Sequence, residues 1–216
     1  MKLKKILLDL ETQRDFFTPG GSCYTRDASA VAGRIYQLFA WAGKYGIPVI
    51  STVLRVRPNE RGPLAKIPHC IDGTDGERKL SRTVLSQRIN LGLRNTTDLP
   101  VDIFQRYRQV IFEKRHTDIF AHARAERLLT ELSAATFVIC GAGLAGGIAE
   151  AAIGLRMRGF GVIVASDAVL DLGDTPAEMA RLRMEAKGTI FVPTRKIISP
   201  RPCRRSRPFT TALARR

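Results

Sequence analysis

The chain has 216 residues, 44% of them hydrophobic, and a formal net charge of +15 at pH 7. This length and apolar content fit one globular domain and exclude a wholly disordered chain. No window approaches the roughly 18 uninterrupted apolar residues of a transmembrane helix. The apolar run before Asp9 is too short for a signal-peptide core, so we expect a cytoplasmic protein without membrane contact.

Much of the positive charge lies at the C-terminal end. Residues 195–216 carry eight Lys or Arg and no acid, which leaves 27 basic and 20 acidic residues in the rest of the chain. This end is rich in Pro and Arg and has no apolar period, so we predict a domain over residues 1–194 and a disordered tail over 195–216. Such a tail can contact nucleic acid non-specifically, although a solvated extension without a function is the simpler explanation.

Short apolar runs alternate with segments of helical spacing along the body of the chain. The alternation indicates a three-layer αβα sandwich around a mainly parallel sheet of about six strands. Most of residues 55–100 is polar and rich in Pro and Gly, which predicts a long loop. Strands are predicted at residues 4–10, 47–54, 109–114, 135–140, 161–166 and 189–194, and helices at 30–46, 118–133, 146–158 and 175–187.

Ligands of such sheets bind beyond the carboxyl ends of the strands. The positions of interest at these ends are Asp9, Lys114, the turn at residues 141–147, and Asp167. The four cysteines lie elsewhere or in the core, and their spacing indicates neither a zinc site nor a disulfide framework. Cys140 belongs to a predicted strand, whereas Cys23 and Cys70 lie in loops that could border a pocket, and Cys203 lies in the tail.

The turn at 141–147 contains a glycine pattern with two interpretations. Gly141, Gly143 and Gly146 spell G-x-G-x-x-G between a predicted strand and a predicted helix, which is the pattern of a dinucleotide pyrophosphate site. Asp167, at the end of the next strand, could then meet a ribose. However, only about 50 residues follow Asp167, too few for a substrate domain. Binding of NAD or FAD therefore stays an alternative.

Four segments in order resemble the isochorismatase-like cysteine hydrolases, and most closely their nicotinamidase branch. LLDLETQRDFFTPGGSCY resembles the opening of these proteins: a strand that ends in an aspartate, here Asp9, then a glutamine, Gln13, and an aspartate–phenylalanine pair. Two more residues separate Asp9 from Gln13 than in the usual pattern. PHCIDGTDGERKL (68–80), FEKRHTDIF (112–120) and the segment 139–168 are similar to the three motifs that follow.

The resemblance implies a three-layer fold and a hydrolase mechanism. In that family a cysteine at the start of a helix attacks an amide or related carbonyl carbon, an aspartate takes the thiol proton, and a lysine supports the charge. Backbone N–H groups hold the oxyanion. Carried over residue by residue, it assigns Asp9 as the base, Lys114 as its partner, the N–H groups of Gly143 and Gly147 as oxyanion donors, and Phe16 and His69 to the pocket.

The nucleophile position is occupied by glycine. The family's cysteine stands six residues after the glycine that ends the strand and twelve before the glycine that closes the helix; both counts reach Gly147. We therefore predict lost or altered thiol chemistry, as in a pseudoenzyme that binds a small amide or carbonyl compound. A slow hydrolase in which Asp9 activates water is the alternative.

The resemblance also bears on metals and partners. His69 fits one metal-ligand position of nicotinamidases, but residues 51–60 offer no acid or histidine where the other ligands belong. We therefore expect neither a metal nor another cofactor. Relatives of this kind usually associate, so a homo-oligomer is expected.

Overall fold

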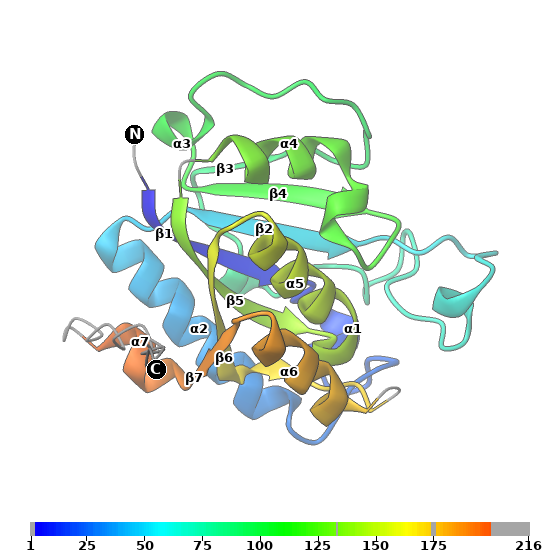
Figure 1. Cartoon of the computed structure of the whole chain (residues 1–216). Coiled ribbons are helices and arrows are strands. Elements are labelled where there is room, and N and C mark those ends of the chain that lie inside the picture. The colour runs from blue at the N-terminus through cyan, green and yellow to red at the C-terminus, as the bar shows by residue number, and fades with distance from the viewer. Residues whose placement is uncertain (1–2, 133, 174–175, 200–216) are drawn as a thin grey trace, which may run out of the picture.

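A seven-stranded sheet forms the centre of the computed structural model, which describes residues 3–132, 134–173 and 176–199 (Figure 1). The strands are β1 (Leu3–Leu10), β2 (Val49–Leu54), β3 (Arg88–Asn90), β4 (Gln109–Lys114), β5 (Ala134–Ala142), β6 (Gly161–Leu170) and β7 (Ile190–Val192). Their order is β3-β4-β2-β1-β5-β6-β7, and every neighbouring pair is parallel. The predicted parallel sheet is confirmed, with β3 as one strand more than predicted.

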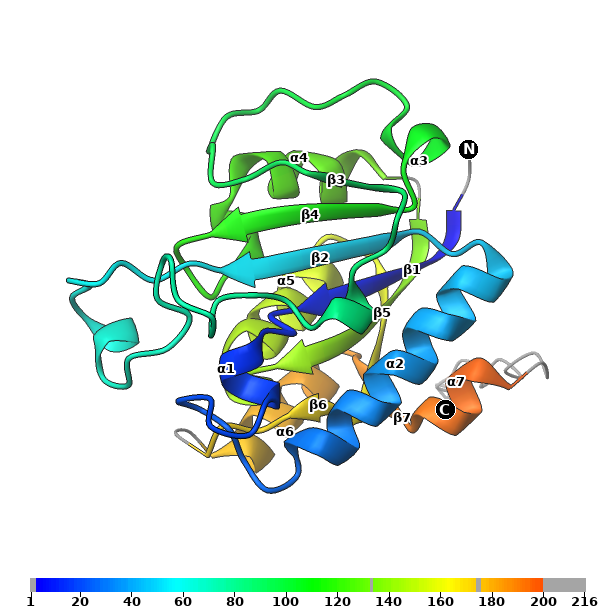
Figure 2. The same cartoon turned by 180° about the vertical axis from the view of Figure 1, so that it is seen from behind.

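Helices cover both faces of this sheet, as the predicted three-layer sandwich requires. On one face lie α2 (Ala28–Tyr45) and α7 (Thr194–Ile198), and on the other α4 (Ala123–Glu131), α5 (Ala149–Met157) and α6 (Ala177–Ala186) (Figures 1 and 2). The shorter elements are α1 (Arg14–Phe17), α3 (Ile103–Arg106), the single turns η1 (Pro63–Ala65), η2 (Ser81–Thr83) and η3 (Ile119–Ala121), and a wider turn, η4 (Leu144–Ile148).

The two layers of core follow from the alternation of side chains along the strands. On β1, Leu8 and Leu10 belong to the core under α4 and α5, whereas Leu7 belongs to the core under α2. Asp9 lies on the same side of the strand as Leu7 and is fully buried. A carboxylate in such a place needs polar partners, because burying an unpaired charge is costly.

The long helix α2 shows why some elements can be predicted from the local sequence alone. Val31, Ile35, Leu38 and Ala42 recur every three or four residues and are buried against the sheet. Gly46 then adopts a φ of +65°, a left-handed conformation that ends the helix at little cost for glycine. By contrast, β3 has only three residues and no apolar run, so its pairing with β4 alone defines it.

The predicted start of the tail at residue 195 is wrong, because residues 195–198 belong to α7. The Thr194 N–H and hydroxyl both donate to Asp167 Oδ1 at 2.7 Å, which ties the start of α7 to β6. Ile197 is buried beside α2. Five residues are too few to show an apolar period, so only these tertiary contacts reveal the helix. Residues 200–216, with the predicted nucleic-acid contact, lie outside the described residues.

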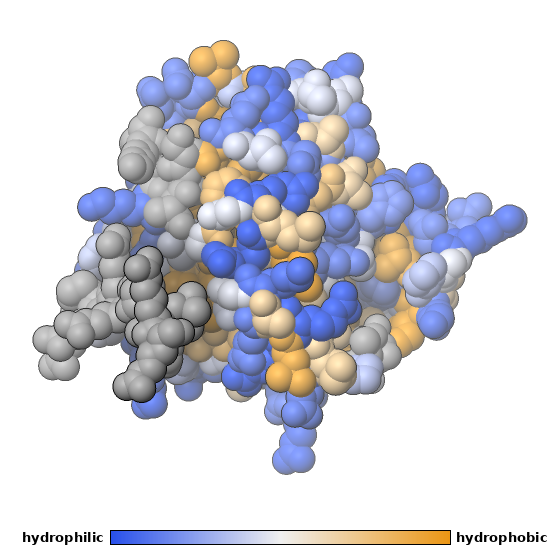
Figure 3. All heavy atoms as spheres, viewed as in Figure 1, coloured by the Kyte–Doolittle hydropathy of each residue, from blue (hydrophilic) through white to orange (hydrophobic). Residues whose placement is uncertain are grey.

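The outer face of α4, α5 and α6 is mostly hydrophilic, with small separate apolar patches (Figure 3). Exposed apolar side chains of this kind include Met157, Met179 and Leu182, and single ones are common on protein surfaces. Within the described ranges, no helix has the length and apolar character to cross a membrane.

His122, between η3 and α4, is a buried histidine that links α4 to the loop after β3. Its Nε2 donates to the Gly92 carbonyl at 3.2 Å, and its ring packs on Phe112 with centroids 5.2 Å apart. Nδ1 is buried without a hydrogen-bond partner among the described residues. Burial is the main cause that lowers the pKa of His122 below its ordinary value.

This environment predicts a loss of stability in mild acid. Between the lowered pKa of folded His122 and the value of about 6.5 in the unfolded chain, the unfolded state binds more protons, so the free energy of unfolding falls as pH falls. Urea unfolding between pH 7.5 and 5.5 should show a smaller loss for His122→Gln than for the wild type, by up to about 1.4 kcal/mol per pH unit. Equal losses in both proteins would contradict this account.

Candidate functional site

A cavity of about 390 Å³ opens at the carboxyl ends of the parallel strands. Residues that follow β1, β2, β5 and β6 contribute to its lining. Four residues predicted for the pocket lie there: Phe16, His69, Gly143 and Gly147. The rings of Phe16 and His69 pack together with centroids 5.4 Å apart. The cavity therefore lies where ligands of parallel α/β sheets usually bind.

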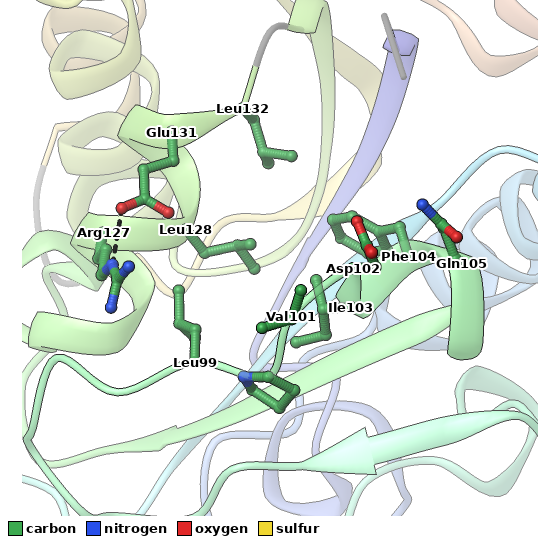
Figure 4. Close-up of a pocket in the computed structure, with 11 residues that line it drawn as sticks. Leu99, Val101, Asp102, Ile103, Phe104, Gln105, Arg127, Leu128, Glu131 and Leu132 are labelled. Atoms are coloured by element: carbon green, nitrogen blue, oxygen red, sulfur yellow. Dashed lines mark hydrogen bonds and ion pairs between the residues drawn. The ribbon is translucent and has the colours of Figure 1, made fainter.

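A second hollow, of about 440 Å³, lies between α3 and α4 near the amino ends of the strands. Figure 4 shows that apolar side chains such as Leu99, Ile103 and Leu128 surround it. Arg127 and Glu131 at its edge are paired with each other, Nε to Oε1, at 2.6 Å. None of the residues predicted for the functional site lines it. We therefore place the candidate site in the first cavity.

Glu11, just after β1, and Lys114, at the end of β4, form a buried ion pair beside this cavity. Their side chains are 4% and 2% exposed. Lys114 Nζ donates to Glu11 Oε1 and to the carbonyls of His116 at 2.7 Å and Thr117 at 2.6 Å. An ammonium group has three N–H donors, so all of them are used. The pair holds the Glu11 carboxylate at the wall of the cavity.

The predicted pairing of Asp9 with Lys114 is wrong. Asp9 Oδ2 accepts hydrogen bonds from Ser51 Oγ and Lys79 Nζ, each at 2.7 Å, and Asp9 does not line the cavity. The reason is a turn at the end of β1. Glu11 has a φ of +56°, a left-handed conformation that costs a non-glycine residue about 1–2 kcal/mol. That turn directs the Glu11 carboxylate toward Lys114 in place of Asp9.

Gln13 carries the signal that could have identified Glu11 from the sequence. Counted back from Gln13 with the usual spacing of the resembled family, the acid falls on Glu11, two residues after Asp9. Gln13 is itself firmly held: its Oε1 accepts from the Leu54 N–H at 2.7 Å, and its Nε2 donates to the Leu54 carbonyl at 2.8 Å. A register anchored on Gln13 would have selected Glu11.

Gly147 lies on the cavity wall next to this ion pair. A Cβ atom added to it would lie 3.3 Å from Glu11 Oε1 and 3.1 Å from the Thr117 carbonyl oxygen. Both distances are slightly tight, so a small side chain needs its neighbours to move by a few tenths of an ångström. The position that the resemblance assigns to a thiol therefore faces a carboxylate and a carbonyl oxygen.

The N–H of Gly143 is not available to an oxyanion, so that prediction is wrong. It donates to the Leu170 carbonyl at 3.0 Å. The carbonyl of Gly143 accepts from the N–H groups of Gly146 at 3.1 Å and Ile148 at 3.2 Å, which closes the wide turn η4. This turn also explains why α5 begins at Ala149 and not at the predicted residue 146.

Two of the three described cysteines, Cys70 and Cys140, are buried and unsuited to replace the nucleophile. Burial is the first cause that raises the pKa of the Cys70 thiol, followed by Glu11 and Asp15, and burial likewise raises the pKa of Cys140. Since the thiolate is the reactive form, these thiols are unsuited to attack a carbonyl. Of the three described cysteines, only Cys23 lines the cavity.

A metal does not fit the residues around the cavity. Among the described residues, no group of three or more His, Cys, Asp or Glu side chains is placed to hold a metal ion. His69 is the one residue that fits a metal-ligand position of nicotinamidases, and its Nδ1 is engaged with the Ile67 carbonyl at 2.6 Å.

The residue that a dinucleotide site would need is also engaged. Asp167 Oδ1 accepts from the Thr194 N–H and hydroxyl, and its Oδ2 lies 3.6 Å from Arg34 Nε. A carboxylate held in this way by α7 and α2 is not free to bind ribose hydroxyls. The G-x-G-x-x-G turn therefore lacks its acidic partner.

Comparison with known proteins agrees with this fold. Nicotinamidase PncA from Bacillus subtilis superimposes with a TM-score of 0.67 at 18% identity, covering 88% of this chain and 99% of that one. N-carbamoylsarcosine amidase from Thermoplasma acidophilum gives 0.68 at 16%, covering 89% and 97%. Pyrazinamidase/nicotinamidase from Streptococcus mutans gives 0.68 at 21%, covering 88% and 100%. No curated protein sequence matches the chain. The isochorismatase domain model matches residues 5–196, and the chain belongs to the isochorismatase family.

Proposed function

We propose that this protein binds a small amide or carbonyl compound in the cavity at Gly147, without the thiol chemistry of a cysteine hydrolase. The observation that carries the proposal is the contrast at the cavity wall. The ion pair of Glu11 and Lys114 is intact and buried, whereas the residue facing it, Gly147, has no side chain. A pocket that keeps its charged pair but has no thiol at the position of the family's nucleophile is suited to bind a polar ligand and not to attack it.

The lining supports a small, partly apolar ligand. Phe16, Leu54 and Leu172 provide apolar wall, while Glu11 and Thr117 provide polar atoms. Solved structures with this fold include nicotinamidases and a carbamoylsarcosine amidase, whose names specify small amide substrates. We extend only the chemical class, an amide or related carbonyl compound, to this chain.

A second candidate function is slow hydrolysis by water. It is favoured by the carboxylate of Glu11, whose Oε1 would lie 3.3 Å from a Cβ at position 147 and thus faces the space a thiol would fill. A water molecule there would be within reach of a general base. Glu11 takes this role in place of Asp9, because Asp9 is enclosed by Ser51 and Lys79. Without a covalent step, such an enzyme would be slow.

Ligand-induced stabilisation separates binding from turnover. We expect nicotinamide, pyrazinamide or N-carbamoylsarcosine to raise the melting temperature, because a ligand at 100 times its Kd adds about 2.7 kcal/mol to the stability of the folded state. Ammonia release should stay at the background rate. Ile67→Trp, at a half-exposed residue of the lining, should narrow the cavity and reduce the shift. Ile190→Trp, at a similarly exposed residue outside it, is the matched control.

The outcomes distinguish the two candidates. Suppose that ammonia release survives replacement of Cys23, Cys70 and Cys140 by serine but is lost in Glu11→Gln. The protein would then be a slow hydrolase that uses water, and not a binding protein without turnover. A melting temperature that no amide raises would contradict both. The predicted homo-oligomer and cytoplasmic location stay predictions.

A further inference from the structure

Six residues with buried side chains form a closed ring of hydrogen bonds near the site; five links join side chains, and the sixth runs through the Thr83 carbonyl. Gln109 Nε2 donates to Ser51 Oγ at 2.8 Å and to the Thr83 carbonyl at 2.9 Å, and Ser51 Oγ donates to Asp9 Oδ2 at 2.7 Å. Lys79 Nζ donates to Asp9 Oδ2 at 2.7 Å and to Thr12 Oγ1 at 2.6 Å. The hydroxyls of Thr12 and Thr83, 3.0 Å apart, close the ring. None of these six side chains lines the cavity.

The ring is well shielded from solvent. The side chain of Lys79 is 5% exposed, and Asp9, Thr12 and Ser51 are fully buried. A buried ion pair of this kind contributes little net stability compared with apolar side chains of similar volume, because both charges lose their hydration. Stability alone is therefore a weak reason for its presence, and its location suggests a more specific role.

Two residues of this ring lie on either side of Glu11, the residue of the site with a left-handed backbone. Asp9 and Thr12 lie on either side of Glu11 in the chain, and one ammonium group, that of Lys79, binds both of them. The Thr12 carbonyl also accepts from the Leu80 N–H at 2.9 Å, so the backbone after Glu11 is held by the same segment. Between these two anchors, Glu11 has its left-handed φ of +56°. Such a conformation persists only where its surroundings enforce it.

We infer that Lys79 is a positioning residue for Glu11: by binding both Asp9 and Thr12, it holds the turn that directs the Glu11 carboxylate toward Lys114 and Gly147. The inference rests on the proposed function, in which Glu11 faces the ligand. It assigns Asp9 a role as the anchor of Lys79 and not as a base. Lys79 itself does not line the cavity.

A thiol introduced by Gly147→Cys serves as a probe of where Glu11 lies. The pH midpoint of its alkylation by iodoacetamide reports nearby charge, because only the thiolate reacts. In this background Glu11→Gln should lower the midpoint by about one pH unit, since a close negative charge disfavours the thiolate. Lys79→Met should lower it similarly, because the released turn withdraws the carboxylate. In a protein that already carries Glu11→Gln, Lys79→Met should cause no further change.

The alkylation experiment has a control variant and two outcomes that would overturn the inference about Lys79. Lys187→Met removes an exposed lysine that directly follows the C-terminal end of α6, and it should leave the midpoint unchanged. If Lys79→Met fails to fold with Asp9 left unpaired, Asp9→Asn/Lys79→Met removes both charges and tests the same point. An unchanged midpoint in a folded variant, or the same shift in the presence of Glu11→Gln, would overturn the inference. The probe needs no amide, so failure of the proposed ligand binding would be seen separately.

Discussion

Gly147→Cys is expected to convert this protein into one that reacts covalently with small amides. The Cβ of the new side chain would lie 3.3 Å from Glu11 Oε1. Position 147 is near the end of the turn η4, two residues before α5 begins. A carboxylate base next to a thiol at a helix start is an arrangement that activates a nucleophile. We expect ammonia release from nicotinamide to rise by about 100-fold or more over the wild type, since positioned proton transfer alone contributes that much.

Peptide mapping after iodoacetamide treatment should find the label at position 147. Gly33→Cys, where an added Cβ meets no atom within 4 Å, places a thiol on the open side of α2 and is the matched control. It should be alkylated without any gain in hydrolysis. The combination of Gly147→Cys with Glu11→Gln should lose the gain, since the base is gone. If Gly147→Cys is folded but neither labels nor hydrolyses, position 147 does not face the ligand and the proposed site is incorrect.

Lys114→Met is expected to destabilise the protein by about 3–5 kcal/mol, the usual cost of leaving one partner of a buried ion pair unpaired. The variant leaves the carboxylate of Glu11 buried and removes the donor shared by the carbonyls of His116 and Thr117. Urea unfolding measures the change, with Lys187→Met as a control that should shift the free energy of unfolding by less than about 0.5 kcal/mol.

A second substitution identifies the partner of Lys114. Glu11→Gln should recover at least about 1 kcal/mol when combined with Lys114→Met, because the unpaired charge is then absent. Asp9→Asn should recover nothing, since Asp9 is paired with Lys79. Recovery by Asp9→Asn in place of Glu11→Gln would restore the pairing first expected from the sequence and contradict the geometry of the site.

The sequence by itself determined the fold and the family. The features that carried these predictions are local: the helical spacing of α2, the apolar runs of β1, β2 and β4, and four motifs in order. Each of them can be identified from its own segment of sequence. Gly147, Phe16 and His69 could be placed at the pocket because they lie at strand ends or in motifs of that family. The short elements β3 and α7 could not be predicted from the sequence, because they have too few residues to show a period. Tertiary contacts define them.

Only the tertiary structure decided which charges meet. Asp9 and Glu11 are both acids at the end of one strand. The spacing to Gln13 favours Glu11, but only the folded chain shows which of the two carboxylates reaches Lys114. The answer depends on the left-handed turn at Glu11 and on Lys79, about 70 residues away in the chain, which binds Asp9 from another segment. In the same way, the N–H of Gly143 is taken by Leu170 of a neighbouring strand. Ion pairs and hydrogen bonds form between groups that are close in space, so their partners follow from packing and not from spacing along the sequence.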